Sequence, residues 1–180
     1  NSLKAENARN IIDAGGTGSD NTSIWLVVWS PTTCHAIYPK GSSAGLQSRD
    51  LGEDTLTDAN GGRYQGYRTH YKWDLGFCLR DWRFAVRIAN IDVPKLRSGT
   101  GAADLLKLLA KAMHRVPNLR MGRAAFYANR EVHEALDIQS LDKTALALKT
   151  QELEGKIWQT FRGIPLRTTD ALLNTEARVV

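Results

Sequence analysis

Few residues of this 180-residue chain have the types and spacing that catalysis or metal binding requires. Cys34 and His35 are adjacent, so on a strand their side chains point to opposite faces, and no second Cys/His pair supplies further zinc ligands. His133 and Glu134 lack the HExxH spacing of a metalloprotease helix. The glycines of residues 15–18 lack the lysine and the strand-to-helix context of a phosphate-binding loop. We therefore expect no enzyme: no catalytic residue, no metal site and no cofactor.

The distribution of charge is more informative than the net charge of +5. Residues 63–97 carry eight basic side chains against three acids, whereas residues 50–58 carry four acids and no base. A basic surface attracts nucleic acid through its phosphates, and it can equally receive an acidic loop of an identical neighbour. Any single arginine of this stretch could also belong to a solvated strand face.

A long extended segment holds most of these cations. Within residues 64–92, apolar and aromatic side chains take odd positions from Tyr67 to Leu79 and even positions from Trp82 to Ile88. A change of parity predicts a bulge or turn within two residues of Arg80 and Asp81. We expect a packed face on each side of this break, formed first by Trp73, Leu75 and Phe77 and then by Trp82, Phe84 and Val86.

The remaining pattern predicts a mixed α+β fold. We expect a helix over residues 2–13, a strand buried on both faces over 24–29, a turn at 60–62 and a hinge at 94–101. Thr100 is the expected cap of a helix that runs to Pro117; a strand over 123–128, a helix capped by Asn129 and extended structure over 157–171 follow. Strands and helices are segregated along the chain, which favours α+β over a regularly alternating parallel sheet.

Composition is that of an ordinary globular protein, with 42% hydrophobic and 24% charged residues. No apolar run approaches the ~20 residues that cross a bilayer, so we expect a soluble protein without a membrane partner. Cys34 and Cys78 lie far apart in apolar segments, which favours buried, reduced thiols. Because the first residue is Asn1, we expect a processed, truncated or excerpted chain.

Four blocks of the sequence resemble those of a known protein family, and they occur in the order expected for it. They are DNTSIWLVVWSPTTCHAIYPKG, HYKWDLGFCLRDWRFAVRIANID, LLKLLAKAMHRVPNLRMGRAAFYANREVHEAL and GIPLRTTDALLNTEARV. Together they look like the carboxy-terminal portion of major capsid proteins of tailed bacteriophages, of the short-tailed phage or prophage kind.

The resemblance implies an HK97-like capsid architecture. It assigns residues 1–97 to a peripheral-type lobe of long antiparallel strands and residues 98–180 to an axial-type lobe with helices, whose last strands return to the first lobe. It also implies that the amino-terminal arm and the extended loop of complete members are absent.

The function implied is that of a coat protein, which self-associates into a viral shell around double-stranded DNA. Its partners are copies of itself, with weak, non-specific contact to the packaged DNA, and its location is the virion, after the cytoplasm of the bacterial host. For the subunit interface we expect Arg80, Arg83 and Arg87 to oppose Asp50, Glu53 and Asp54 of a neighbour.

A module that binds single-stranded nucleic acid is the alternative function. Aromatic side chains between cations, such as Tyr64, Tyr67, Tyr71 and Trp73, can stack on bases while the cations follow the backbone. This function requires both kinds of side chain on one exposed face, whereas the parity of the aromatic residues predicts a core stripe.

Overall fold

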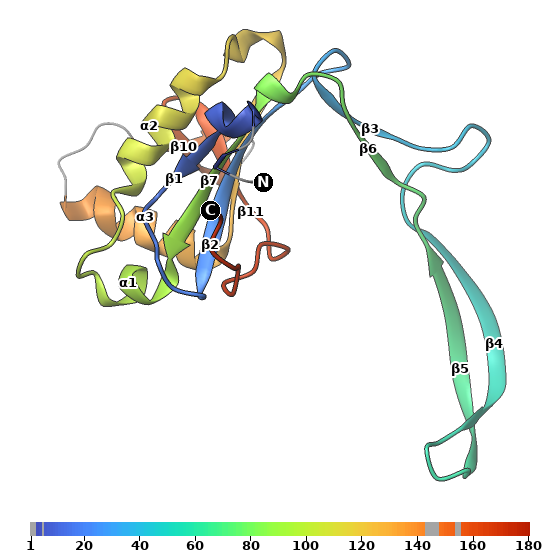
Figure 1. Cartoon of the computed structure of the whole chain (residues 1–180). Helices are drawn as coiled ribbons and strands as arrows, with labels where there is room; N and C mark the ends of the chain where they lie inside the picture. Colours follow the sequence, from blue (N-terminus) through green and yellow to red (C-terminus); the bar gives the residue numbers. More distant parts are fainter. Residues whose placement is uncertain (1–2, 5, 143–147, 154–155) are drawn as a thin grey trace. The chain divides into compact units, whose positions relative to one another are not determined.

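The computed structural model describes residues 3–4, 6–142, 148–153 and 156–180, and the chain folds as two compact units (Figure 1). The first, here called the core unit, comprises Asn1–His35 and Leu79–Val180. The second, here called the hairpin unit, comprises Ala36–Cys78. The described helices all belong to the core unit.

A mixed sheet with strand order β1-β7-β2-β8-β11-β10-β9 forms the centre of the core unit. Its strands are β1 (Ile11–Asp13), β2 (Asn21–Trp29), β7 (Ala85–Asp92), β8 (Arg123–Ala128), β9 (Leu148–Leu153), β10 (Lys156–Phe161) and β11 (Ile164–Thr168). Strand β2 is central, antiparallel to both β7 and β8. Sequentially distant strands therefore lie side by side.

Side chains at even positions of β2 form the core. Ile24, Leu26 and Val28 are buried in one cluster with Leu105 and Leu109 of a helix. Since side chains alternate along a strand, the odd positions of β2 face the opposite side of the sheet. The expectation that this strand is buried on both faces is wrong at Trp25 and Trp29, which are only half-buried.

Three α-helices, α1 (Val93–Ser98), α2 (Leu105–Arg115) and α3 (Arg130–Asp142), lie on one side of the sheet (Figure 1). The cap of α2 is Asp104, not Thr100, because the Asp104 carboxylate accepts the Lys107 N–H at 3.3 Å. The expected cap of α3 is confirmed, since Asn129 Oδ1 accepts the Val132 N–H at 2.9 Å. None of the described helices is long and apolar enough to span a bilayer.

Two expectations for short segments are wrong. The amino-terminal helix is only a 3-10 turn, Glu6–Asn10, which is followed directly by β1, because Ile11 and Ile12 complete an edge of the sheet beside β7. Helix α1 occupies the segment that we expected to be a hinge, and it is capped by Asp92 and closed by Gly99 in the left-handed conformation (φ 71°).

The hairpin unit is dominated by two long antiparallel strands, β4 (Gln47–Thr57) and β5 (Arg63–Lys72). The turn between them is confirmed: Asp58 Oδ1 accepts the N–H groups of Asn60 and Gly62, each at 2.8 Å. At ~3.3 Å per residue, the 11 residues of β4 extend over ~35 Å. Shorter pieces belong to β3 (Cys34–Ile37) and β6 (Gly76–Leu79), which pair with each other.

The predicted break of the long extended segment is confirmed. Strand β6 ends at Leu79, and Asp81 caps a 3-10 turn, Trp82–Phe84, before β7 begins. The packed face expected before the break is wrong, because Trp73, Leu75 and Phe77 are all exposed. After the break Phe84 and Val86 are buried, while Trp82 is exposed.

The overall class, mixed α+β, is confirmed. The compact units meet in sequence at His35/Ala36 and Cys78/Leu79, so the hairpin unit is an insertion between two parts of the core unit. The assignment of residues 1–97 and 98–180 to peripheral-type and axial-type lobes stays a prediction. The expected absence of an extended loop does not fit residues 36–78, which are themselves an extended hairpin.

Candidate interaction surfaces

The cysteine and histidine residues that we considered as catalytic or metal-binding candidates do not form a site. Cys34 is buried and Cys78 is half-buried, and neither forms a disulfide. His133 Nδ1 lies 3.2 Å from Gln159 Oε1 on the surface of α3. Within the described residues, no group of three or more His, Cys, Asp or Glu side chains is placed to hold a metal ion.

The hairpin unit is the first notable surface, because it has no core of its own. None of its residues is buried, yet it carries ten exposed large hydrophobic side chains. They are Ile37, Tyr38, Leu46, Leu51, Tyr64, Tyr67, Tyr71, Trp73, Leu75 and Phe77. An isolated two-stranded hairpin is marginally stable in water, so this unit gains stability when another surface covers these groups.

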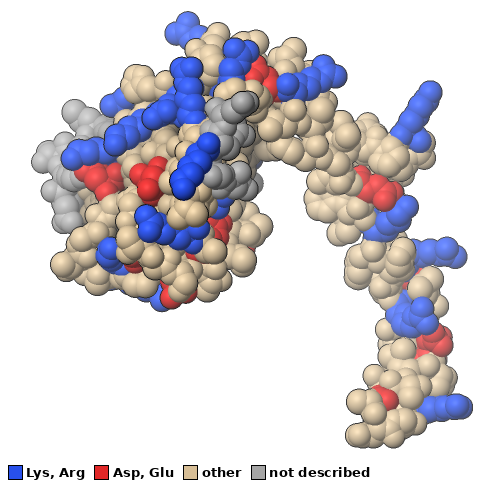
Figure 2. Space-filling model, viewed as in Figure 1, with Lys and Arg blue, Asp and Glu red and all other residues tan. Residues whose placement is uncertain are grey.

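Alternation along β5 sorts its side chains onto two faces. Arg68 and Lys72 share one face with Tyr64, while Tyr67, which is 80% exposed, shares the other with Tyr71. Figure 2 shows cations spaced along the hairpin unit with acidic residues between them. Arg63, at an odd position like Tyr67 and Tyr71, lies on their face of β5, so each face combines tyrosine with at least one cation.

Of the three arginines expected at an interface, only two are exposed. Arg87 is largely buried: its Nη2 donates to Glu176 Oε2 at 2.9 Å, and its guanidinium lies 5.3 Å from the centre of the Trp25 ring. Arg83 is exposed but pairs with Asp81 of its own turn at 2.7 Å. Arg80 is exposed at the end of β6.

The three expected acids lie together on β4. Asp50 Oδ1 accepts the Gly52 N–H at 2.9 Å, and Glu53 Oε1 accepts the Tyr67 hydroxyl at 2.9 Å. Asp54 forms an ion pair with Arg68 across the hairpin. Each carboxylate therefore has a local partner within the hairpin unit; Asp50 and Glu53 are exposed, and the Asp54 side chain is 46% exposed.

The Asp81–Arg83 pair perturbs both groups. Hydrogen bonds from Arg83 lower the pKa of the Asp81 carboxyl, and the same contacts raise the pKa of the Arg83 guanidinium. Arg97 forms a similar pair with Glu131, and the hydrogen bond from its guanidinium raises the pKa of Arg97. The first pair lies within one turn, and the second joins α1 to α3.

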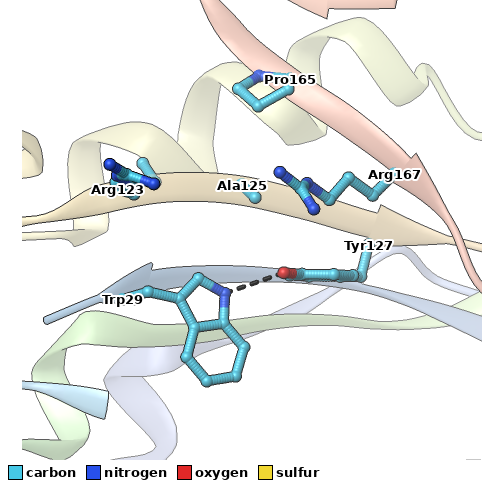
Figure 3. Close-up of a pocket in the computed structure, with 7 residues that line it drawn as sticks. Trp29, Arg123, Ala125, Tyr127, Pro165 and Arg167 are labelled. Carbon is cyan, nitrogen blue, oxygen red and sulfur yellow. Dashed lines mark hydrogen bonds between the residues drawn. The ribbon is translucent and has the colours of Figure 1, made fainter. Parts of the chain in front are cut away.

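The second surface lies on the side of the core sheet that faces away from the helices, here called the open face. A groove of about 520 Å³ on it is lined by Trp29, Arg123, Ala124, Ala125, Tyr127, Pro165 and Arg167. Trp29 Nε1 donates to the Tyr127 hydroxyl at 2.8 Å, and the two rings meet edge to face (Figure 3). Figure 3 places Arg123 and Arg167 toward the two ends of an otherwise apolar floor.

Sequence reasoning missed this groove. The missed signal was the two tryptophans at odd positions of β2, together with Tyr127 on β8: large side chains with a polar tip favour a partly solvated face. The pairing of β8 with both β2 and β11 brings Arg123 and Arg167 to this groove. That juxtaposition is not visible from spacing alone.

Comparison with known proteins points to one family. The model of the family "Major capsid protein GP7" matches residues 1–180. A solved structure of bacteriophage Epsilon15, determined by cryo-EM and modelling, is similar with a TM-score of 0.60 and 37% sequence identity. The similarity covers 99% of this chain and 55% of that chain, so this chain spans about half the length of its structural relative. No curated protein matches it.

Proposed function

The chain belongs to the major capsid protein GP7 family, and from this premise we propose that it is a structural subunit that associates with copies of itself into a viral shell. The observation that carries this proposal is the hairpin unit. It exposes ten large hydrophobic side chains and buries none of its residues, which is unusual for a protein that works as a monomer.

The mechanism is geometric. Each subunit binds one neighbour through one patch and a second neighbour through a different patch. Such heterologous contacts form a closed ring when the rotations between successive subunits add up to a full turn. The hairpin unit supplies the offered patch, and a rigid surface of the core unit receives it. Apolar burial supplies the affinity, while charged residues set the register.

Within the HK97-like architecture, the hairpin unit serves as the extended loop. Support comes from its length, its lack of a core and its insertion between two parts of the core unit. The helices α2 and α3 with their sheet supply the axial-type lobe. The shell encloses double-stranded DNA, which the basic surface of the protein contacts weakly and without regard to sequence.

Charged pairs between subunits remain part of this proposal. The acids Asp50, Glu53 and Asp54 would face Arg80 and Arg83 of a neighbour. Arg87 contributes indirectly, because its ion pair with Glu176 holds the core unit together. Reversal of Arg80 and Arg83 to Glu tests the direct pairing.

Negative-stain microscopy of the purified chain, combined with mass measurement over a range of concentrations, tests the function. We expect rings, sheets or shells and a mass that increases with concentration. A monomer at every concentration, with tight binding to single-stranded DNA, would replace the proposal with a nucleic-acid-binding function.

A further inference from the structure

The positive charge of the chain is concentrated between Asp104 and Glu131. Residues 105–130 contain six Lys or Arg residues and no Asp or Glu, whereas the rest of the chain contains 18 basic and 19 acidic residues. This segment therefore accounts for the whole of the net charge of +5. It comprises helix α2, the turn after it and strand β8, up to the first residue of α3. A local excess of one sign attracts ligands of the opposite sign.

Helix α2 carries its cations on the side that faces away from the core. Lys107, Lys111 and Arg115 are exposed and lie four residues apart, so they follow one another at intervals of ~6 Å along one side of the helix. Leu105 and Leu109 of the same helix are fully buried in the core cluster. The apolar side of α2 therefore fixes the helix on the sheet, and its cationic side contributes nothing to the core.

Two further arginines lie near the carboxy-terminal end of α2. The Arg115 guanidinium donates through Nη1 to the Arg9 carbonyl oxygen at 2.7 Å, which brings the exposed Arg9 beside the helix. Arg120 is exposed in the 3-10 turn Leu119–Met121 that follows. Figure 2 shows Lys and Arg side chains gathered over the part of the core unit where Figure 1 labels α2. This surface, here called the α2 patch, consists of Arg9, Lys107, Lys111, Arg115 and Arg120.

Among the described residues, four of the five cations of the α2 patch have no carboxylate partner. The exception is Lys107, whose Nζ lies 3.1 Å from Asp104 Oδ2. By contrast, the three Lys and Arg residues of α1 and α3 each form an ion pair with an acid. They are Lys95, Arg97 and Arg130. The charge of the α2 patch is therefore directed at solvent, whereas that of the neighbouring helices is neutralised within the fold.

The surroundings of the α2 patch favour the backbone of duplex DNA as its ligand. Single strands are held by exposed aromatic rings on which bases stack, and protein partners by a cluster of aromatic or apolar anchors. Within residues 105–130, all of which the structure describes, Met121 is the only exposed large hydrophobic side chain. A double helix carries one phosphate charge per ~1.7 Å of its axis, so a row of cations meets phosphates without reading the bases.

We propose that the α2 patch binds the phosphate backbone of duplex DNA. This inference rests on the proposed function and deepens it, since it assigns the contact with the enclosed DNA to one side of the core unit. Binding is independent of sequence and is lost at high salt, because each cation that meets a phosphate releases counterions. The patch belongs to the core unit, so this contact does not involve the hairpin unit.

Fluorescence anisotropy with a labelled duplex of about 20 base pairs tests the site, at salt concentrations from about 50 to 200 mM and at protein concentrations below the onset of self-association. The patch variant is Lys111→Gln/Arg115→Gln/Arg120→Gln. Each lost phosphate contact lowers the slope of log K against log salt concentration by about 0.9, so we expect a slope smaller by about 2 to 3. At about 50 mM salt the patch variant should bind the duplex at least ~10-fold more weakly than the wild type.

The matched control is Lys95→Gln/Arg97→Gln/Arg130→Gln, which removes three ion-paired cations from the same unit and gives the same net charge. It should bind the duplex within about 2-fold of the wild type and with the same slope.

Thermal melts check that the variants are folded. If the loss of the Arg115 hydrogen bond lowers the melting temperature of the patch variant, the double variant Lys111→Gln/Arg120→Gln, which keeps this bond, decides the test with an expected slope smaller by about 2.

The remaining outcomes separate the inference from the function on which it rests. Patch and control variants with equal slopes would overturn the inference. A patch variant that binds the duplex normally but no longer associates would also overturn it, because the patch would then be a subunit interface, and the shell function would stand. Tighter binding of a single-stranded oligonucleotide than of the duplex would overturn the choice of ligand. A wild-type chain that binds the duplex through the patch but never associates would contradict the shell function and support the DNA contact.

Discussion

Arg87 and Glu176 form an ion pair of 2.9 Å that fastens the carboxy-terminal segment to the open face of the sheet. Their side chains are only 11% and 19% exposed. The other Glu176 oxygen, Oε1, accepts the Ser23 hydroxyl at 3.0 Å, and the same segment pairs its backbone with Asn21 of β2. The pair therefore belongs to the framework of the core unit, so reversing the charge of Arg87 would damage the fold before it affected any assembly.

Glu176→Ala should destabilise the core unit by about 3 kcal/mol, because it leaves the largely buried Arg87 guanidinium without its counter-charge. Asp170→Ala is the matched control, since the ion pair of Asp170 with Arg130 is mostly exposed and should contribute under about 1 kcal/mol. Urea unfolding of both variants and the wild type measures the difference. Equal losses in the two variants would show that Glu176 has no special role.

Gly122→Ala should lower stability by about 1–3 kcal/mol, as overpacked sites do. A Cβ at this position would overlap the carbonyl oxygen of Trp29, a backbone atom that cannot move without shifting β2. Gly18→Ala is the control, because the nearest atom to its Cβ is 3.9 Å away. Thermal melts distinguish the two, and a Gly122 variant as stable as the Gly18 variant would contradict the close approach of Gly122 to the Trp29 backbone.

Low pH should remove the contribution of the Asp81 carboxylate to the free energy of unfolding. Its pKa is lowered in the folded chain, so the carboxylate stabilises the fold above the ordinary aspartate pKa of about 3.9 and loses this effect as the pH falls through the lowered value. The contribution is small because the pair is exposed. Urea unfolding of the wild type and Asp81→Asn at pH 7 and at pH 3 measures it. We expect the difference between them to shrink at pH 3; a constant difference would mean that the carboxylate charge is not involved.

The hairpin unit should be the least protected part of the unassembled chain. Without buried residues, its backbone hydrogen bonds open easily, whereas those of β2 and β7 lie beneath a packed helical layer. Hydrogen exchange followed by mass spectrometry should show fast exchange over residues 47–72 and slow exchange over β2. On assembly, residues 47–72 should become protected. Slow exchange there in the monomer would mean that another part of the chain covers it.

Local chemistry made several features predictable from the sequence. The parity change at Arg80 and Asp81, the Asn60–Gly62 turn and the Asn129 cap each depend on a few neighbouring residues, and all three are confirmed. The family resemblance is also confirmed. These predictions succeeded because turn and cap preferences are properties of short segments.

Features that depend on distant pairing were not predictable. An alternating row such as Tyr67, Tyr71 and Trp73 looks the same whether it packs on its own core or awaits a neighbour, and here these residues are exposed. The burial of Arg87 depends on Glu176, 89 residues away in sequence. The groove that contains Arg123 and Arg167 likewise depends on strand order, because β8 lies between β2 and β11 only in the folded sheet.

The central claim is that the hairpin unit joins one subunit to the next. Replacing Ala36–Cys78 by a short Gly/Ser linker tests it directly, and the core unit should tolerate this change because Arg80 N donates to Thr33 O at 2.8 Å, so the two ends are adjacent. Sedimentation velocity of the folded, shortened chain beside the full chain is the decisive measurement. We predict concentration-dependent association of the full chain and a monomer for the shortened chain at all concentrations; equal association of the two would contradict the account.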